Sequence, residues 1–151
     1  MRLDHKIFEI VREESEGLSR IHESNSSVLK ELGPLMDSFV HIGGDEVNLD
    51  CWKKTESIEK WMKDRNWDAS RTMKYFMLRV HDIVTSLGKE MIAWEEVFAS
   101  CGKSLDKSVI LQVWLSAKHA IKFVEAGHRV IFDPYPTWYL VSCTEIGVLI
   151  V

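Results

Sequence analysis

The stretch SFVHIGGDEV, residues 38–47, decides the fold prediction. It opens as a short apolar run, which the paired glycines Gly43 and Gly44 end. A short apolar run that stops at glycine is typical of a buried strand that continues into a loop. Two carboxylic acids, Asp45 and Glu46, follow at once. The pattern therefore predicts a strand with acidic side chains just beyond its carboxyl end.

Further strands and helices are predicted along the chain. Near-continuous apolar runs at residues 91–94, 109–114 and 130–132 indicate strands covered on both faces. Apolar residues at helical spacing, with Ile121 and Val124 in the last helix, indicate helices between them. The predicted helices run over residues 52–64, from a cap at Asp68 or Ser70 to Gly88, and from Ser116 to Gly127, with one or two more before Gly33.

The order of these elements predicts an α/β fold with a parallel sheet. Strand, helix, strand, strand, helix, strand is the alternation in which right-handed crossovers place helices over a sheet. A doubly wound sheet and a (β/α)8 barrel both fit this order. A barrel usually needs about 250 residues, and the chain has 151. A barrel here would therefore be incomplete.

Composition narrows the class of protein. With 46% hydrophobic and 28% charged residues, the chain can form one hydrophobic core. A net charge of −4 and the lack of a basic run argue against a nucleic-acid partner. No segment approaches the roughly 20 apolar residues of a membrane span, and the charged residues at the start of the sequence predict no signal peptide there. The sequon Asn25-Ser26-Ser27 and three cysteines hint weakly at a secretory origin.

Residues suited to a sugar site follow three of the four predicted strands. Asp45 and Glu46 follow the first strand, Trp94 ends the second and Trp114 ends the third. Ligands of parallel α/β folds bind beyond the carboxyl ends of the strands, so these side chains are expected to converge. Glycosidic cleavage needs one carboxylic acid that supplies a proton and one carboxylate that stays charged. An adjacent Asp-Glu pair alone more often caps a helix.

A metal site and a serine or cysteine nucleophile have less support in the sequence. His41, Asp45 and Glu46 are hard-ligand types close in sequence, but the other histidines are scattered, so no metal site or cofactor is expected. A serine nucleophile is not expected because the Gly-x-Ser-x-Gly motif is absent. A cysteine nucleophile is not expected because no cysteine lies near a base in sequence.

Four ordered blocks resemble one enzyme family. The first is HIGGDEV at residues 41–47, followed by Cys51-Trp52; the others are IAWEEVF at 92–98, QVW at 112–114 and WYL at 138–140. Their sequences and order resemble the β-N-acetylhexosaminidases, family 20 of the glycoside hydrolases. The resemblance implies a (β/α)8 TIM barrel, of which this chain holds the central strands only. The resemblance extends over about residues 38–140. The chain is therefore expected to hold a partial catalytic domain at residues 1–140 and an unmatched tail at 141–151.

The resemblance also implies a mechanism in which the acetamido oxygen of the substrate attacks the anomeric carbon. Glu46 would be the general acid and later the base, while Asp45 would accept the acetamido N–H and stabilise the oxazolinium charge. Tyr139 would donate to the acetamido carbonyl. Trp94 and Trp114 would form walls around the sugar, although for tryptophan alone core packing is the more common role.

Expectations also concern His41, Glu96 and the binding partners. His41 is expected to orient the loop through a hydrogen bond or to touch the ligand, with the first favoured, and Glu96 has no assigned role. The resemblance implies N-acetylhexosamine-terminated glycans or chitooligosaccharides as substrates, a homodimer in full-length members, and a lysosomal or secreted location. Two alternatives stay open: an inactive fragment that acts at most as an interaction protein, and an unrelated α/β domain.

Overall fold

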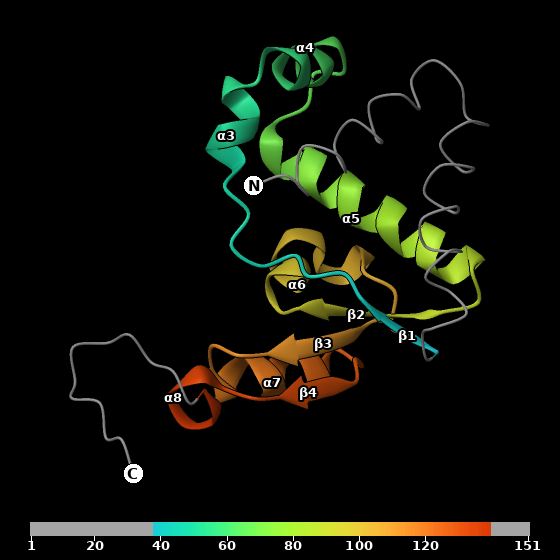
Figure 1. Cartoon of the computed structure of the whole chain (residues 1–151), viewed down its shortest axis with the longest axis vertical. Helices are drawn as coiled ribbons and strands as arrows, with labels where there is room; N and C mark the ends of the chain where they lie inside the picture. The colour runs from blue at the N-terminus through green and yellow to red at the C-terminus, as the bar shows by residue number, and fades with distance from the viewer. Residues whose placement is uncertain (1–37, 140–151) are drawn as a thin grey trace.

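The computed structural model describes residues 38–139 of the chain, which contain one parallel sheet (Figure 1). All four predicted strands are confirmed, although their bounds differ slightly. The predicted helices before Gly33 and the tail at 141–151 lie outside the described residues. The strands are β1 (Phe39–His41), β2 (Glu90–Trp94), β3 (Ile110–Val113) and β4 (Val130–Phe132).

The strand order separates the two architectures that the sequence left open. The strands lie side by side in the order β1-β2-β3-β4, and each neighbouring pair is parallel. A doubly wound sheet reverses its order at a switch point, whereas strands follow the chain order around a (β/α)8 barrel. The described residues therefore form part of a barrel, as predicted.

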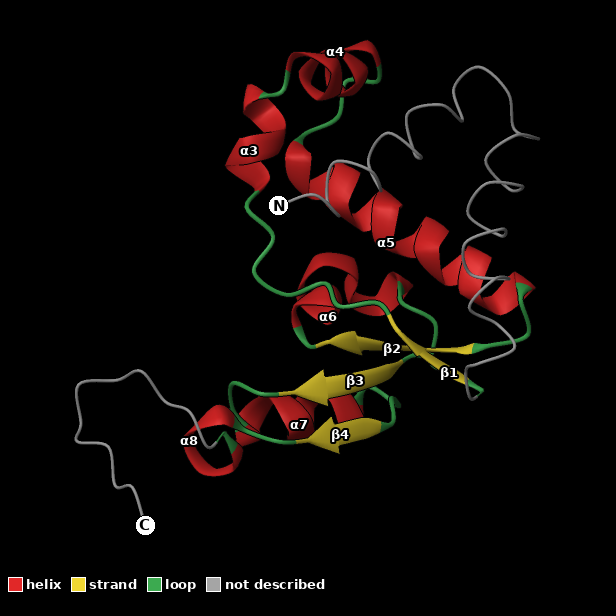
Figure 2. Ribbon diagram, viewed as in Figure 1, coloured by secondary structure: helices red, strands yellow, loops and turns green. Residues whose placement is uncertain are grey.

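The helices of the described chain lie between and after the strands (Figure 2). Helix α5 packs on β2 and α6, while α7 packs on β3 and β4. In residues 38–139, no helix is both long enough and apolar enough to span a bilayer. The helices are α3 (Leu49–Lys54), α4 (Glu56–Asp64), α5 (Ala69–Ser86), α6 (Glu96–Cys101), the 3-10 helix η2 (Gly102–Ser104), α7 (Ala117–Glu125) and α8 (Tyr135–Trp138).

Local capping chemistry explains the two helices that the sequence located well. The Asp68 side chain accepts from the Arg71 N–H at 2.7 Å and starts α5. The Ser116 hydroxyl accepts from the Lys118 N–H at 3.2 Å and starts α7. Side-chain oxygens at these positions satisfy backbone donors that have no partner within the helix.

Two helix predictions were wrong. The single helix expected over residues 52–64 is two helices, α3 and α4, because Thr55 is extended with φ −89° and ψ 111°. Its hydroxyl donates to the Cys51 carbonyl at 3.0 Å, a local bond that competes with helix geometry. Helix α6 was missed altogether. It spans only six residues, too few to show a helical repeat within an apolar stretch.

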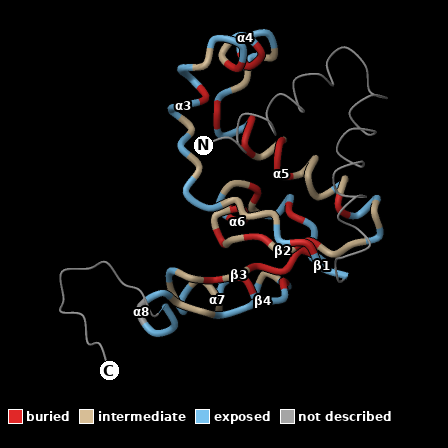
Figure 3. The backbone as a smooth tube through the Cα atoms, viewed as in Figure 1, coloured by how far each residue is buried: buried red, intermediate tan, exposed pale blue. Residues whose placement is uncertain are grey.

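The burial of the outer elements also differs from the prediction (Figure 3). Ile121 and Val124, whose spacing indicated α7, are 61% and 60% exposed, and the buried residue of this helix is Phe123. Strand β4 was expected to be covered on both faces. Ile131 and Phe132 are instead exposed in the described part of the chain. Periodicity identified these elements but not the faces that they bury.

The two faces of the sheet differ in chemistry at its carboxyl end. Alternate residues of a strand point to opposite faces, and paired residues of parallel strands share a face. Met91 and Ala93 of β2 are buried in the core. Trp94 faces the other way, and its register partner is Gln112 of β3. His41, the partner of Ile92, lies on that same face.

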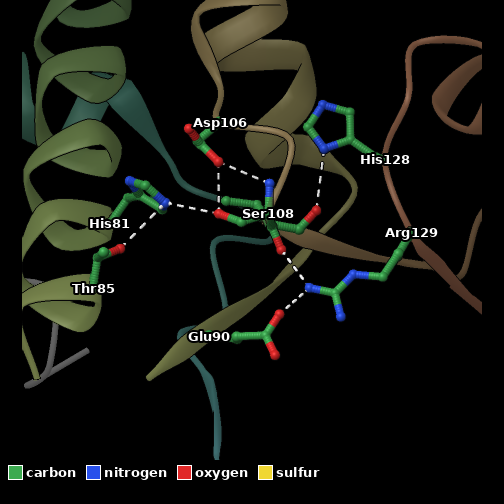
Figure 4. Close-up of polar contacts among 8 residues, drawn as sticks. His81, Thr85, Glu90, Asp106, Ser108, His128 and Arg129 are labelled. Carbon is green, nitrogen blue, oxygen red and sulfur yellow. Dashed lines mark hydrogen bonds and ion pairs between the residues drawn. The ribbon is translucent and has the colours of Figure 1, made fainter. Parts of the chain in front are cut away.

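A cluster of polar side chains lies at the amino ends of the strands (Figure 4). The Asp106 carboxylate accepts from the Ser108 hydroxyl at 2.6 Å, and Arg129 bonds the Ser108 carbonyl at 2.9 Å. Arg129 also pairs with Glu90 at the start of β2. His81 of α5 lies 3.4 Å from the Ser108 hydroxyl. These contacts join the starts of β2, β3 and β4 to α5.

Candidate active site

The loop after β1 depends on its two glycines. Gly43 and Gly44 have φ of 72° and 100°, values that side chains rarely adopt. A Cβ on Gly44 would lie 2.4 Å from Cγ2 of Val97, so the loop backbone rests directly on α6. Asp45 and Glu46 follow and are exposed. The backbone thus turns immediately before the two carboxyls, as the sequence indicated.

His41 connects this loop to the neighbouring strands. Its Nδ1 accepts from the Gly43 N–H at 3.0 Å, so in the neutral ring the proton lies on Nε2. The ring also hydrogen-bonds the Gln112 side chain and packs edge-on against Trp94, with centroids 5.0 Å apart. Burial lowers the pKa of His41, although the Gln112 bond and the charge of Asp45 act in the opposite direction. The neutral imidazole is therefore favoured.

Gln112, which bonds His41, also bonds Asp133 just after the end of β4. Its amide nitrogen donates to Oδ2 of Asp133 at 2.6 Å. The other carboxylate oxygen, Oδ1, is buried and has no hydrogen-bond partner among residues 38–139. An unpartnered buried oxygen is a costly feature that is common at binding sites. Within residues 38–139, Oδ1 of Asp133 is therefore a buried acceptor without a partner at the carboxyl end of the sheet.

Trp114 is half-buried just after β3 and is held by several contacts. Its indole N–H donates to the two carboxylate oxygens of Glu96 at 3.2 and 3.3 Å. Its backbone N–H donates to Oε1 of Glu95 at 2.9 Å. Its ring lies 6.2 Å from that of Tyr135, centroid to centroid, in a tilted arrangement. The indole is thus fixed at the edge where Trp94 also ends its strand.

Charged groups at the carboxyl end of the sheet affect one another's titration. Tyr139 is 42% exposed. Partial desolvation, with the charges of Asp133, Asp45 and Glu96, raises the pKa of its phenol. Burial also raises the pKa of Glu96, with smaller contributions from the charges of Glu95 and Asp45. The charge of Asp45, which follows β1, thus acts on groups that follow β2 and β4.

The structure brings most of the predicted site residues to one edge. Asp45, His41, Trp94, Trp114 and Tyr139 all lie at the carboxyl end of the sheet and share contacts or charge interactions there. Glu46 sits in the same loop, but its side chain makes no hydrogen bond or ion pair within the described ranges.

Three polar residues at this edge were missed by sequence reasoning. Gln112 and Glu95 stood inside quoted motifs but were given no role. Asp133 follows an apolar run as Asp45 does, so the same strand-end rule could have found it. The contacts between them could not be found, because they depend on which strands are neighbours.

Other chemistries gain no support from the described residues. No group of three or more His, Cys, Asp or Glu side chains in residues 38–139 could hold a metal ion. Ser108 lies near His81 and Asp106, but its hydroxyl donates its proton to the Asp106 carboxylate rather than to the imidazole. That geometry is the reverse of what an activated serine needs.

Comparisons with known proteins identify the family to which this chain is similar. The family described as "Glycosyl hydrolase family 20, catalytic domain" matches residues 13–146. Beta-hexosaminidase 1 of Arabidopsis thaliana is 43% identical over 100 residues, which cover 66% of this chain and 18% of the plant protein. Beta-hexosaminidase subunit beta of Rattus norvegicus is 33% identical over 109 residues, which cover 69% of this chain and 20% of the rat protein.

A solved structure shows the same fold. The GH20 exo-β-N-acetylglucosaminidase from Vibrio harveyi, in complex with N-acetylglucosamine, matches with a TM-score of 0.68 and 31% identity. The match covers 80% of this chain and 19% of the Vibrio chain. The chain thus spans about a fifth of the length of each of these relatives. It belongs to glycosyl hydrolase family 20 and corresponds to part of the catalytic domain of that family.

Proposed function

We propose that this chain carries the acid side of a β-N-acetylhexosaminidase site, which releases terminal non-reducing N-acetyl-D-hexosamine from N-acetyl-β-D-hexosaminides. The observation that supports this most is the packing of His41 against Trp94 at the carboxyl end of a barrel-type sheet, beside the loop that carries Asp45 and Glu46. These groups come from the ends of different strands, and active sites of such barrels are built in this way.

Glu46 supplies the proton in the proposed reaction. The acetamido oxygen of the substrate attacks the anomeric carbon while the Glu46 carboxylic acid protonates the departing glycosidic oxygen. The resulting carboxylate then takes a proton from water, which opens the oxazolinium with overall retention. The exposed position of Glu46 leaves its carboxyl open to substrate and water.

Asp45 and Tyr139 hold the acetamido group during this attack. The Asp45 carboxylate accepts the acetamido N–H and stabilises the positive charge that develops on the ring. The Tyr139 phenol O–H donates a hydrogen bond to the acetamido oxygen. Because the pKa of Tyr139 is raised, the phenol keeps this proton at neutral and moderately alkaline pH.

Trp94 and Trp114 provide apolar walls for the sugar. Indole faces match the C–H surface of a pyranose and the acetamido methyl group. Both side chains are half-buried, so each keeps some surface available for contact. His41 positions the catalytic loop through its bond from Gly43.

Substrate range and location belong to the same proposal. N-acetylhexosamine-terminated glycans or chitooligosaccharides are the expected substrates, and a homodimer is expected for the whole protein. A lysosomal or secreted location would place Asn25 where it can be glycosylated. A mobility shift after enzymatic removal of N-glycans would support that location, and unmodified Asn25 in the natural protein would argue against it.

The test is the release of a chromogenic aglycone from an N-acetyl-β-glucosaminide by the purified chain. Glu46→Gln should abolish turnover, while Glu56→Gln on the exposed surface of α4 should leave it unchanged. A matched glucoside without the acetamido group should not be cleaved, because it lacks the internal nucleophile. Folded chain without turnover would instead favour the alternative, an interaction protein.

A further inference from the structure

A buried carboxylate lies beside the candidate site and has no role in the proposed reaction. Glu95 is 3% exposed and sits between β2 and α6. Its Oε1 accepts from the backbone N–H groups of Trp114 and Leu115, at 2.9 and 2.7 Å. Its Oε2 bonds Nδ1 of His119, on α7. One side chain that follows β2 therefore fixes the loop that follows β3.

The burial of this carboxylate requires compensation. A buried charge is strongly unfavourable unless it is paired and hydrogen-bonded. Two backbone donors and an imidazole supply the partners of Glu95. In return, the two N–H groups at the start of the loop after β3 have an acceptor, which they would otherwise lack away from water.

The neighbouring acid reaches a different part of the same residue. Adjacent residues at a helix start point in different directions. Glu95 thus bonds the backbone of Trp114, whereas Glu96 accepts from its indole N–H at 3.2 and 3.3 Å. The Trp114 carbonyl accepts from the Tyr135 N–H at 2.8 Å. The backbone donor, the backbone acceptor and the side-chain donor of Trp114 are all occupied.

We infer that Glu95 and Glu96 are positioning residues that fix the Trp114 indole in the orientation of a sugar-binding wall before substrate arrives. This inference rests on the proposed function, because it takes Trp114 as a wall of the N-acetylhexosamine site. A wall fixed in advance loses little conformational freedom on binding and holds the substrate in one pose. Glu95 sets the backbone of that wall, and Glu96 sets the rotation of its ring.

The position of Trp114 can be read independently of turnover. The chain is labelled with 5-fluorotryptophan, and the fluorine resonance of Trp114 among the six tryptophans is assigned from its loss in Trp114→Phe. Glu96→Leu removes the acceptor, so the Trp114 resonance should shift and broaden. Glu96→Gln keeps an amide oxygen for the indole N–H and should restore the wild-type resonance. The Trp94 resonance serves as an internal reference.

The role of Glu95 is tested with a second pair of variants and the same Trp114 resonance. Both backbone donors go to Oε1, so the amide oxygen of Glu95→Gln can replace it, whereas Glu95→Ala leaves both donors unpaired. The alanine variant should therefore disturb the Trp114 resonance and the glutamine variant should not. Glu90→Gln, at the opposite end of β2 from Glu95, is the matched control. If Glu95→Ala fails to fold, Glu96→Leu decides the question.

Kinetics separate positioning from general stability. In Glu96→Leu, KM for the chromogenic N-acetyl-β-glucosaminide should rise about five-fold, the equivalent of one lost hydrogen bond, and kcat should fall less than about two-fold. Glu96→Gln should restore both values. An unchanged Trp114 resonance in folded Glu96→Leu protein would overturn the inference. If the wild-type chain shows no turnover, the proposed function fails, and the fluorine spectra still decide whether the two acids position Trp114.

Discussion

The backbone N–H of Gly43 donates to Nδ1 of His41 at 3.0 Å, across the point where β1 ends and the acidic loop begins. The same imidazole bonds Gln112, whose amide donates to Asp133. The loop that carries Asp45 is therefore tied to the ends of β3 and β4.

His41→Phe should release this tie. The phenyl ring keeps the packing against Trp94 but offers no acceptor to Gly43, so the Gly43 amide should exchange with solvent at least about ten-fold faster. His41→Asn places an oxygen near the position of Nδ1 and should retain most of the protection. The Ile42 amide, which donates to the Ile92 carbonyl at 2.9 Å, is the reference. Equal Gly43 protection in the phenylalanine variant would contradict the assignment.

Gly44→Ala should lower the free energy of unfolding by about 2 kcal/mol or more. The new Cβ would meet Val97 at 2.4 Å, and φ of 100° is unfavourable for alanine. Gly102→Ala is the matched control, because its φ is also positive at 55° but no atom lies within 4 Å of the added Cβ. Urea unfolding should show the larger loss for Gly44→Ala. Similar losses in the two variants would mean that the contact with Val97 is unimportant.

The stability of the chain should fall as the pH drops below about 6.5. His128 is buried against Phe98. Its Nδ1 donates to the Val109 carbonyl at 3.1 Å, a bond drawn as a dashed line from His128 in Figure 4. Its Nε2 is buried without a partner in the described residues. Burial lowers its pKa, the Lys107 charge adds to this, and the Val109 bond and the Asp106 charge oppose it.

The direction of this pH dependence follows from the number of protons that the folded and unfolded chains bind. Between the unfolded pKa and the lower folded pKa, the unfolded chain binds a proton that the folded chain does not, so falling pH favours unfolding. His128→Gln keeps a donor for Val109 but does not titrate in this range. Urea unfolding at pH 7.5 and 5.5 should show a smaller difference in this variant. A residual difference is expected from His41, whose pKa is also lowered.

Cys101 should be alkylated much more slowly than Cys51. Burial raises the pKa of Cys101 to about 11, so only a very small fraction is thiolate at pH 8. Cys51 is an exposed free thiol. Brief treatment with iodoacetamide followed by peptide mass spectrometry should find modified Cys51 and intact Cys101 in folded protein. Both should react after unfolding in urea, and equal rates in the native chain would argue against the burial of Cys101.

Much of the architecture could be predicted because its causes are local. Asp68 and Ser116 cap their helices through bonds to the next turn, and such signals stand in the sequence itself. The strand-end rule likewise anticipated that Asp45 and Trp114 would lie at one edge. Family resemblance supplied the barrel, which alternation alone could not distinguish from a doubly wound sheet.

The remaining features depend on tertiary neighbours. The bond from Gln112 to Asp133 follows from the pairing of β3 with β4, which no single segment encodes. The exposure of Ile121 depends on what α7 packs against rather than on its own periodicity. Helix α6 spans only six residues, so its apolar positions were too few to show a helical repeat in the sequence.

The backbone of Glu46 has φ of 47°, a left-handed conformation that glycine or asparagine adopts more readily than glutamate. A protein engineer who ranked substitutions by stability alone would therefore favour Glu46→Gly, which should relieve roughly 1 kcal/mol of strain. In the proposed reaction that substitution removes the general acid. Selecting variants of this loop for stability alone would therefore remove the proposed general acid, so a stabilised variant meant for activity measurements must keep Glu46.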